Sequence, residues 1–214
     1  MDFHNLLENL KNQSFFSNLI IERGIEKESL RVTNNGYISN KKHPETLGSS
    51  YTNPSITTDF AESLIEIVTP TYTNVDELYE KLEMIHIFIN QNLKDGEMLW
   101  PFSMPPKIED ESKINIATYG KTNMGRLKHV YRKGLAIRYG KTMQCVSGIH
   151  YNFSISNESL KQLGYSSQNE KNKAYLNLIR NFKRLFWFVL IEFGNSPVVD
   201  KSFVAGRAND LAIL

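Results

Sequence analysis

The sequence has little cysteine, no long apolar run and no strong excess of charge of one sign. Cys145 is its only cysteine, which excludes an internal disulfide framework and a cysteine-rich zinc site. The longest apolar run covers residues 185–191, whereas a membrane-spanning helix needs about 20 such residues. The formal net charge is +2, so whole-surface electrostatics do not favour nucleic acid as the default partner.

The two ends of the sequence also lack expected features. The first twenty residues contain Asp2 and Glu8 and no continuous apolar core, so they are not a secretory signal. With no disulfides either, we expect a cytoplasmic protein without a membrane partner. The last two residues, Ile213 and Leu214, are apolar, whereas domain ends are usually polar. We therefore expect that a continuation of the chain is missing.

The composition is that of a folded chain. Hydrophobic residues make up 41% and aromatic residues 11% of the 214 residues, which excludes a disordered or low-complexity protein. Helices and strands do not alternate regularly, so the predicted fold class is α+β. The periodicity and the turn residues predict strands at 20–33, 62–69 and 145–155, helices at 74–94, 123–139 and 170–193, and loops at 40–58 and 100–106.

Two glutamates in the first strand share one face. Glu26 and Glu28 are two residues apart, and Glu22 lies further along the same face. Carboxylates so placed repel each other unless a positive group lies between them, and Mg²⁺ prefers oxygen ligands. A solvated outer face with scattered charges is the simpler interpretation of this segment alone.

A second acidic group lies at residues 59–66. Glu62 and Glu66 have the same parity in the predicted strand, and Asp59 precedes them. Acidic side chains within an apolar strand are costly without a partner, which favours a metal site somewhat. An amphipathic strand with one wet face is the competing interpretation. His150 lies in a third strand, where a single histidine is more often structural than a ligand.

A basic segment at residues 121–141 contains no acid, and none follows before residue 151. Such a segment can face a polyanion such as a nucleoside triphosphate, or form an exposed helix face. Gly-Lys-Thr occurs twice, at 120–122 and 140–142, but a phosphate-binding loop needs a glycine five residues earlier. Those positions hold Asn115 and Leu135, so we exclude a P-loop ATPase. Nucleic-acid binding through this segment is a weak further hypothesis.

Several segments together resemble bacterial glutamate–cysteine ligase of the enteric type. The resemblance covers about residues 20–205, and each motif alone is only moderately specific. The matching strings are RGIEKESLRV (23–32), HPETLGS (43–49), ITTDFAESLIEIVTP (56–70), LWPFSMP (99–105), YGKTNMGRLKHVYRKGLAIRYG (119–140) and GIHYNFS (148–154).

The resemblance implies a fold and a set of site residues. The fold is similar to glutamine synthetase, with a curved antiparallel sheet and helices packed outside it, incomplete in this chain. The resemblance assigns no ligand role to Glu62, no role to Cys145, and no ATP contact to any named residue. It implies metal ligands at Glu26, Glu28, Asp59, Glu66 and His150, and a pocket for the acceptor cysteine at Phe60, Tyr131 and Gln144.

The implied reaction joins the side-chain carboxylate of L-glutamate to the amino group of L-cysteine, with ATP as co-substrate, Mg²⁺ as cofactor and an acyl phosphate intermediate. It is the first step of glutathione biosynthesis. Because the nucleophiles belong to the substrates, no catalytic serine or cysteine of the protein is expected. The resemblance favours a monomer.

Family members are more than twice as long as this sequence. Residues 1–214 are therefore expected to be the N-terminal part of a single catalytic domain, without measurable ligase activity alone. The alternatives are a non-catalytic remnant that binds a nucleotide or a partner, and a related carboxylate–amine ligase.

Overall fold

A computed structural model describes His4, Glu8, Lys11 and residues 18–194 and 198–206. The chain divides into two compact units, one of Met1–Arg23 and Phe153–Ser196 and the other of Gly24–Asn152 and Pro197–Leu214. Ile213 and Leu214, whose apolar character suggested a continuation, lie outside the described residues. Among the described helices, none combines the length and apolar character that crossing a bilayer requires.

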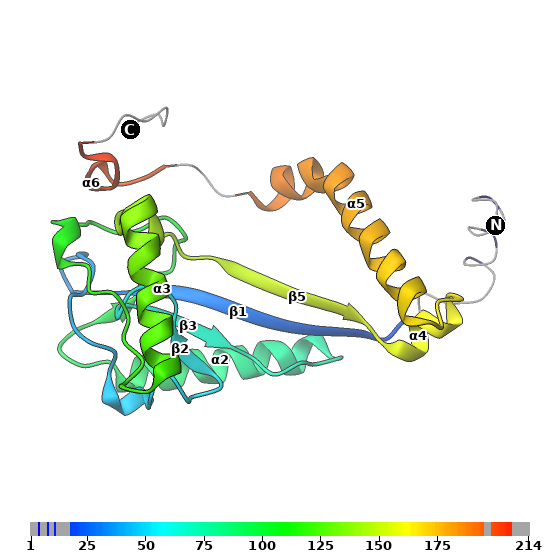
Figure 1. The fold of residues 1–214 in the computed structure, drawn as a ribbon, viewed down its shortest axis with the longest axis horizontal. Helices are drawn as coiled ribbons and strands as arrows, with labels where there is room; N and C mark the ends of the chain where they lie inside the picture. Colours follow the sequence, from blue (N-terminus) through cyan, green and yellow to red (C-terminus); the bar gives the residue numbers. More distant parts are fainter. Residues whose placement is uncertain (1–3, 5–7, 9–10, 12–17, 195–197, 207–214) are drawn as a thin grey trace. The chain divides into compact units, whose positions relative to one another are not determined.

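The larger unit is built on a five-stranded sheet with β1 (Ile21–Val32) at its centre (Figure 1). β1 pairs with β3 (Leu64–Val68), β4 (Met98–Leu99) and β5 (Ile149–Ile155), and β3 also pairs with β2 (Ile56–Thr58). The pairs β1–β3, β1–β4 and β2–β3 are antiparallel. The β1–β3 register places Glu28 opposite Glu66 and Leu30 opposite Leu64, so these four residues share one face of the sheet.

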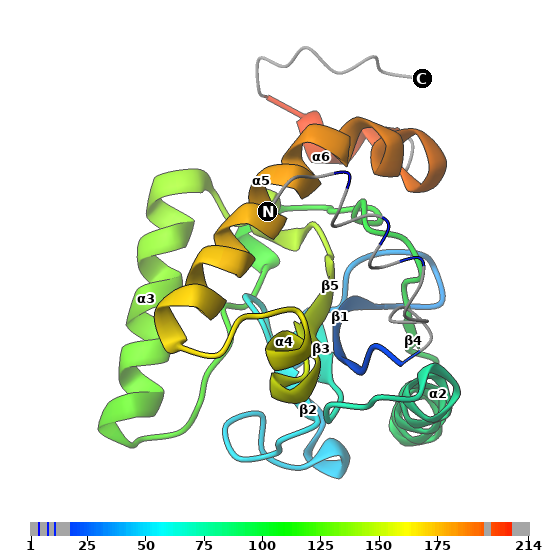
Figure 2. The same cartoon turned by 90° about the vertical axis from the view of Figure 1, so that its right-hand side faces the viewer.

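Helix α2 (Val75–Asn92) covers the opposite face (Figure 2). Asn74 caps its first turn, because the side-chain oxygen accepts the N–H of Asp76 at 2.7 Å. Ile85 and Ile89 of α2 pack in one core cluster with Ile65 and Ile67 of β3. The helix predicted at residues 74–94 is thus α2, and its buried residues are Leu78, Ile85 and Ile89.

Helix α3 (Asn123–Tyr139) lies on the face that carries Glu28 and Glu66 (Figure 2). Leu135 and Ala136 of this helix pack against a core cluster that includes Leu30 and Leu64. The short helix α6 (Lys201–Val204) adds Phe203 to the same cluster. The sheet therefore separates two apolar cores, and the acidic side chains lie on the α3 side.

The α+β prediction is confirmed, with corrections to several boundaries. The predicted strand at 145–155 begins only at Ile149, because Cys145 is the last residue of a 3-10 turn, η4 (Thr142–Cys145). The Thr142 N–H holds this turn in place by donating to the Glu111 carboxylate at 3.1 Å. The predicted strand at 62–69 is the shorter β3. The predicted loop at 40–58 contains β2 and a 3-10 turn, η2 (Glu45–Leu47), and β4 and η3 (Glu111–Lys113) were not predicted.

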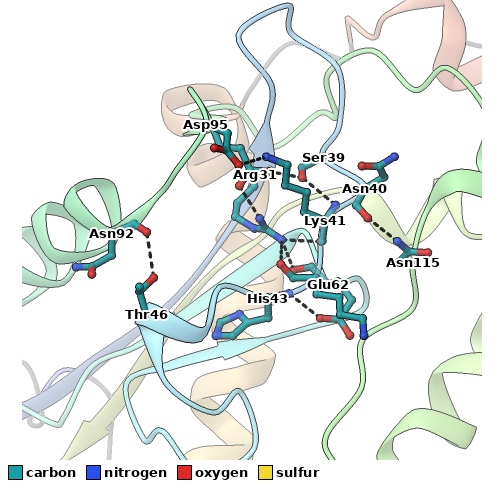
Figure 3. A network of polar contacts seen from close by, with 12 residues as sticks. Arg31, Ser39, Asn40, Lys41, His43, Thr46, Glu62, Asn92, Asp95 and Asn115 are labelled. Atoms are coloured by element: carbon teal, nitrogen blue, oxygen red, sulfur yellow. Dashed lines mark hydrogen bonds and ion pairs between the residues drawn. The ribbon is translucent and has the colours of Figure 1, made fainter.

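A buried ion pair connects β1 to the loop after α2. The Arg31 guanidinium lies 2.7 Å from the Glu97 carboxylate, and the two side chains are 1% and 4% exposed. Arg31 also donates to the backbone carbonyls of Lys41, Lys42 and Glu62 at 2.8, 2.9 and 3.0 Å (Figure 3). A single side chain thereby fixes the loop around residue 41 and the turn that leads into β3.

The smaller unit contains the ends of β1 and β5, helix α4 (Asn157–Gln162) and helix α5 (Gln168–Phe193). Ser167 caps α5 in a capping box with Glu170. The Tyr175 hydroxyl of α5 accepts the N–H of Ile155 at 3.0 Å, which attaches the first turns of this helix to the end of β5.

Cys145 provides a test of this packing. Its side chain is fully buried, and desolvation raises the pKa of the thiol to about 12. Because the thiolate is the reactive form, we expect alkylation of the folded chain at pH 8 to be on the order of a hundredfold slower than alkylation in urea, as measured by mass spectrometry. Complete labelling of the folded chain at the rate of a free thiol would contradict the buried position.

Candidate metal-binding site

Three glutamates on neighbouring strands form the acidic part of the site. Glu26 and Glu28 lie on β1, and Glu66 of β3 lies directly opposite Glu28. Burial raises the pKa of Glu28 above its usual range, and the charges of Asp59 and Glu26 raise it further. The two-residue spacing places Glu26 and Glu28 on one face, as the sequence predicted, and the β1–β3 register adds Glu66 to that face.

β5 brings a histidine to this acidic face. The ring Nδ1 of His150 lies 3.2 Å from a carboxylate oxygen of Glu26, and the Asn152 side chain donates to the other oxygen at 3.1 Å. The Gly148 N–H donates to the Glu28 carboxylate at 2.7 Å. The hydrogen bond to Glu26 raises the pKa of His150, and the charge of Glu28 adds to the effect.

Asp59 reaches the site from the turn between β2 and β3. Its backbone carbonyl accepts the Nε–H of Arg132 and lies 2.8 Å from the Tyr119 hydroxyl. The Arg132 guanidinium also lies 4.0 Å from the Asp59 carboxylate and 4.7 Å from the centre of the Tyr119 ring. Arg132 was not among the predicted site residues, because in the sequence it is one of many bases at 121–141. The spacing of Arg132 within helix α3 gives no signal of this contact.

The charge balance of the site is unfavourable without a cation. Burial raises the pKa of Glu66 to about 7, and the negative charges of Asp59, Glu28 and Glu26 add to the shift. Arg132 and His150 are the positive groups that act in the opposite direction on Glu66 and Glu28, respectively. A face with this many carboxylates and a half-buried acid protonated near neutral pH is suited to a divalent cation.

Neutralising Glu66 should stabilise the metal-free chain at high pH. Because the pKa of Glu66 is about 7 in the fold against an ordinary value of 4.5, folding takes up a proton between these values, and stability falls as the pH rises through that window. The shift corresponds to about 3 kcal/mol for a fully buried group, which solvent screening of this half-exposed carboxyl reduces to about 1 kcal/mol. We expect Glu66→Gln to raise the free energy of unfolding by that amount at pH 8.

Urea unfolding at two pH values measures this effect. At pH 3.5 the variant and the parent chain should have nearly equal stability, because Glu66 is then largely protonated in both the folded and the unfolded chain. A stabilisation that is the same at both pH values would contradict the electrostatic explanation. Glu22→Gln, which changes an exposed glutamate on β1, the strand that pairs with β3, is the control.

The carboxylates of the site are suitable ligands for a hard cation, although their oxygens do not surround one common point in this structure. Within the part of the chain that the structure describes, no group of three or more His, Cys, Asp or Glu side chains is arranged to hold a metal ion as it stands. Carboxylate oxygens are the ligands that Mg²⁺ prefers, and a divalent cation would offset the negative charges of Asp59, Glu28 and Glu26 around Glu66. Side-chain rotations from this arrangement are needed to close a ligand shell.

Glu62 does not belong to this face, which corrects the prediction that it shares one with Glu66. It lies in the turn before β3 and is 5% exposed. Its carboxylate accepts the N–H of His43 at 2.8 Å and both the N–H and the hydroxyl of Thr118 at 2.9 and 2.6 Å. Glu62 is thus a hydrogen-bonded structural carboxylate that connects two loops.

The three residues predicted to bind the acceptor substrate lie in different environments. Phe60 is 1% exposed and belongs to the core cluster on the α3 side. Tyr131 is 63% exposed on α3, and Gln144 is half-buried in the turn η4. Their role in binding the acceptor substrate therefore stays a prediction.

The basic segment 121–141 is divided among several roles in the structure. Lys128 and Arg132 lie over the ring of Tyr119, at 5.1 and 4.7 Å from its centre. Arg126, Lys133 and Arg138 are exposed on α3. Part of the segment therefore supports the turn that carries Asp59, part is exposed on α3, and the Lys141 ammonium donates to the Ile114 carbonyl at 2.8 Å.

This chain is similar to known proteins in sequence and in fold. The sequence profile of the family described as glutamate–cysteine ligase matches residues 5–214. Glutamate–cysteine ligase of Hahella chejuensis is 47% identical over 197 residues, which are 89% of this chain and 38% of that protein. The Pseudomonas aeruginosa enzyme of the same name is 50% identical over 194 residues, or 88% of this chain and 37% of that protein.

Two solved structures also match. The crystal structure of Francisella tularensis glutamate–cysteine ligase in complex with AMP has a TM-score of 0.81 and 36% identity, and the match covers 89% of this chain and 38% of that one. A bifunctional glutathione synthetase from Pasteurella multocida has a TM-score of 0.76 and 33% identity, with 86% and 24% covered. The chain thus spans less than two fifths of these relatives, and it belongs to the glutamate–cysteine ligase family.

Proposed function

We propose that this chain forms the N-terminal part of the catalytic domain of a glutamate–cysteine ligase and supplies most of its metal-binding face. The observation that carries the proposal is the set of carboxylates on one face of β1 and β3, with the pKa of Glu66 raised to about 7. Membership of the family and the AMP bound to the Francisella tularensis relative support a nucleotide-dependent ligase.

In this proposal, Glu26, Glu28, Asp59, Glu66 and His150 hold Mg²⁺. Held there, Mg²⁺ would supply positive charge that offsets the negative charge of the phosphate groups. The chain's own contribution is to fix the ligands in place. Gly148 holds the Glu28 carboxylate, Asn152 holds that of Glu26, and Arg132 anchors the turn that carries Asp59.

The reaction follows from the substrates of the family. The side-chain carboxylate of L-glutamate attacks the γ-phosphorus of ATP, ADP leaves, and an acyl phosphate forms. The amino group of L-cysteine then attacks the acyl carbon and displaces phosphate, which gives γ-glutamylcysteine. We assign the pocket for the acceptor L-cysteine to Phe60, Tyr131 and Gln144, as the sequence resemblance implies.

A joined enzyme tests the proposal. Residues 1–214 are joined to the part of the Pseudomonas aeruginosa relative that lies beyond the matched region, and ADP release is measured. We expect release that requires ATP, L-glutamate, L-cysteine and Mg²⁺ together, and none from residues 1–214 alone. ADP release with another amine at the rate seen with L-cysteine would instead indicate a related carboxylate–amine ligase.

A non-catalytic remnant gives a different result. Such a protein would bind nucleotide or a partner as residues 1–214 and would show no turnover in the joined enzyme. The whole Pseudomonas aeruginosa enzyme is assayed in parallel. Its activity shows that the part taken from this relative is functional under the assay conditions.

A further inference from the structure

Helix α5 presents more apolar surface than a solvated helix can carry. It runs over 26 residues, from Gln168 to Phe193, and none of them is buried (Figure 1). Its first turns attach to β5 through Tyr175, whereas the side chains that follow have no such cover. The apolar residues that are at least 49% exposed are Leu176, Ile179, Phe182, Leu185, Phe186, Trp187, Phe188, Leu190, Ile191 and Phe193.

These residues form two patterns along the helix. From residue 175 to 182 the apolar positions recur at the spacing of one helix face, while Asn177, Arg180 and Asn181 occupy the other. From residue 185 to 191 every residue is apolar, so this last part is apolar all round. A helix segment that is apolar on all sides is one that a folded protein surrounds with other polypeptide.

The charges on α5 restrict what can cover it. The helix has no acid from residue 171 to 191, and its exposed bases there include Arg180, Lys183 and Arg184. A second copy of α5 would bring like charges together, which disfavours a symmetric contact through this helix. An interfacial membrane helix keeps a polar face along its length, which the segment 185–191 lacks.

We propose that the apolar surface of α5 from Ile179 to Phe193 is an interface for the part of the ligase fold that the relatives have and residues 1–214 do not span. The relatives carry more than three fifths of their length beyond the matched region. The proposed occupant is therefore a polypeptide with an apolar face and acidic residues at its edge, which surrounds the end of α5 as a shared core. This inference rests on family membership and not on the proposed reaction.

Association of two separate parts tests the inference. Residues 1–214 are co-expressed with the complementary part of the Pseudomonas aeruginosa relative, each with its own tag, and the purified material is examined by light scattering. We expect a one-to-one complex. Replacing Phe182 and Phe186 together by Ser should weaken the complex at least tenfold, because each loses a desolvated aromatic contact. Asn177→Ser with Asn181→Ser, on the opposite face of the same turns, is the matched control and should leave affinity unchanged.

The accessibility of an introduced thiol on α5 is a second measurement. It uses the joined enzyme, so the two parts need not associate as separate chains. Phe186→Cys is made in residues 1–214 and in the joined enzyme, where Cys145 is buried and unreactive. We expect alkylation of the new thiol to be at least tenfold slower in the joined enzyme, whereas Asn177→Cys should react equally fast in both. The experiment measures labelling and not turnover, so it tests this inference separately from the proposed function. Slow labelling of Phe186→Cys in a joined enzyme that has no activity would support the interface and contradict the proposed function.

Three outcomes would overturn the inference. One is equal alkylation of Phe186→Cys in the two proteins. Another is a dimer of residues 1–214 alone that the Phe182 and Phe186 replacements dissociate, which would identify a second copy as the occupant. The third is sedimentation of residues 1–214 with vesicles of anionic phospholipid, lost in the same variant, which would identify a membrane surface.

Discussion

Glu97→Gln is expected to lower the free energy of unfolding of this chain by about 3–5 kcal/mol, because it leaves the buried Arg31 guanidinium without its counter-charge. The two groups are 2.7 Å apart and nearly inaccessible to solvent. Burial lowers the pKa of Arg31, and Glu97 is the strongest group acting in the opposite direction. Urea unfolding followed by circular dichroism measures the loss.

Asp95→Asn is the matched control, since it removes one charge from an exposed ion pair two residues away. The Lys41–Asp95 pair has a distance of 2.6 Å, but its side chains are 46% and 73% exposed. Exposed pairs contribute about 0–1 kcal/mol, so this variant should change stability little. Equal losses for the two variants would show that Glu97 acts only through its place in the loop.

Arg31→Met should be at least as damaging as Glu97→Gln. Arg31 also donates to the carbonyls of Lys41, Lys42 and Glu62, which lose this donor in the variant. Combining Arg31→Met with Glu97→Leu removes the unpaired charge but not the unsatisfied carbonyls. The double variant should therefore recover part of the loss and not all of it.

Local chemistry allowed much of the fold to be predicted from the sequence. Helix α3 has the predicted bounds, because Thr122 caps its first turn and Gly140, with a φ of 82°, ends it. Gly125 lies in this helix although glycine lowers helix propensity, because a Cβ there would lie 2.2 Å from the carbonyl oxygen of Tyr119. A residue that lowers helix propensity is thus required by the packing of the preceding loop.

Long-range contacts could not be read from the sequence. Arg31 looked like one polar residue in a strand, and its partner Glu97 is 66 residues away in the chain. Glu62 and Glu66 matched the two-residue strand period, but β3 begins after Glu62, and the carboxylate of Glu62 bonds to His43 and Thr118 instead. Parity predicts a shared face only where the strand is continuous.

Glu28→Gln is expected to reduce turnover of the joined enzyme at least a hundredfold. Gln keeps the size of the side chain and can accept the Gly148 N–H, whose distance to Glu28 is 2.7 Å. It removes the negative charge opposite Glu66, so the proposed cation loses an anionic ligand. The expected size is that seen when one preorganised group that stabilises transition-state charge is removed, about 10²–10³ in rate.

Two further readouts distinguish a lost ligand from a damaged fold. Higher Mg²⁺ concentration should restore part of the activity of Glu28→Gln. Urea should unfold the metal-free variant no more easily than the parent chain, since burial and neighbouring acids already raise the pKa of Glu28.

Glu22→Gln makes the same chemical change at an exposed position of the same strand and should keep turnover within about twofold. Unchanged turnover in Glu28→Gln, with Glu22→Gln also active, would remove Glu28 from the metal site. Lost activity without any dependence on Mg²⁺ concentration would assign it a structural role through Gly148.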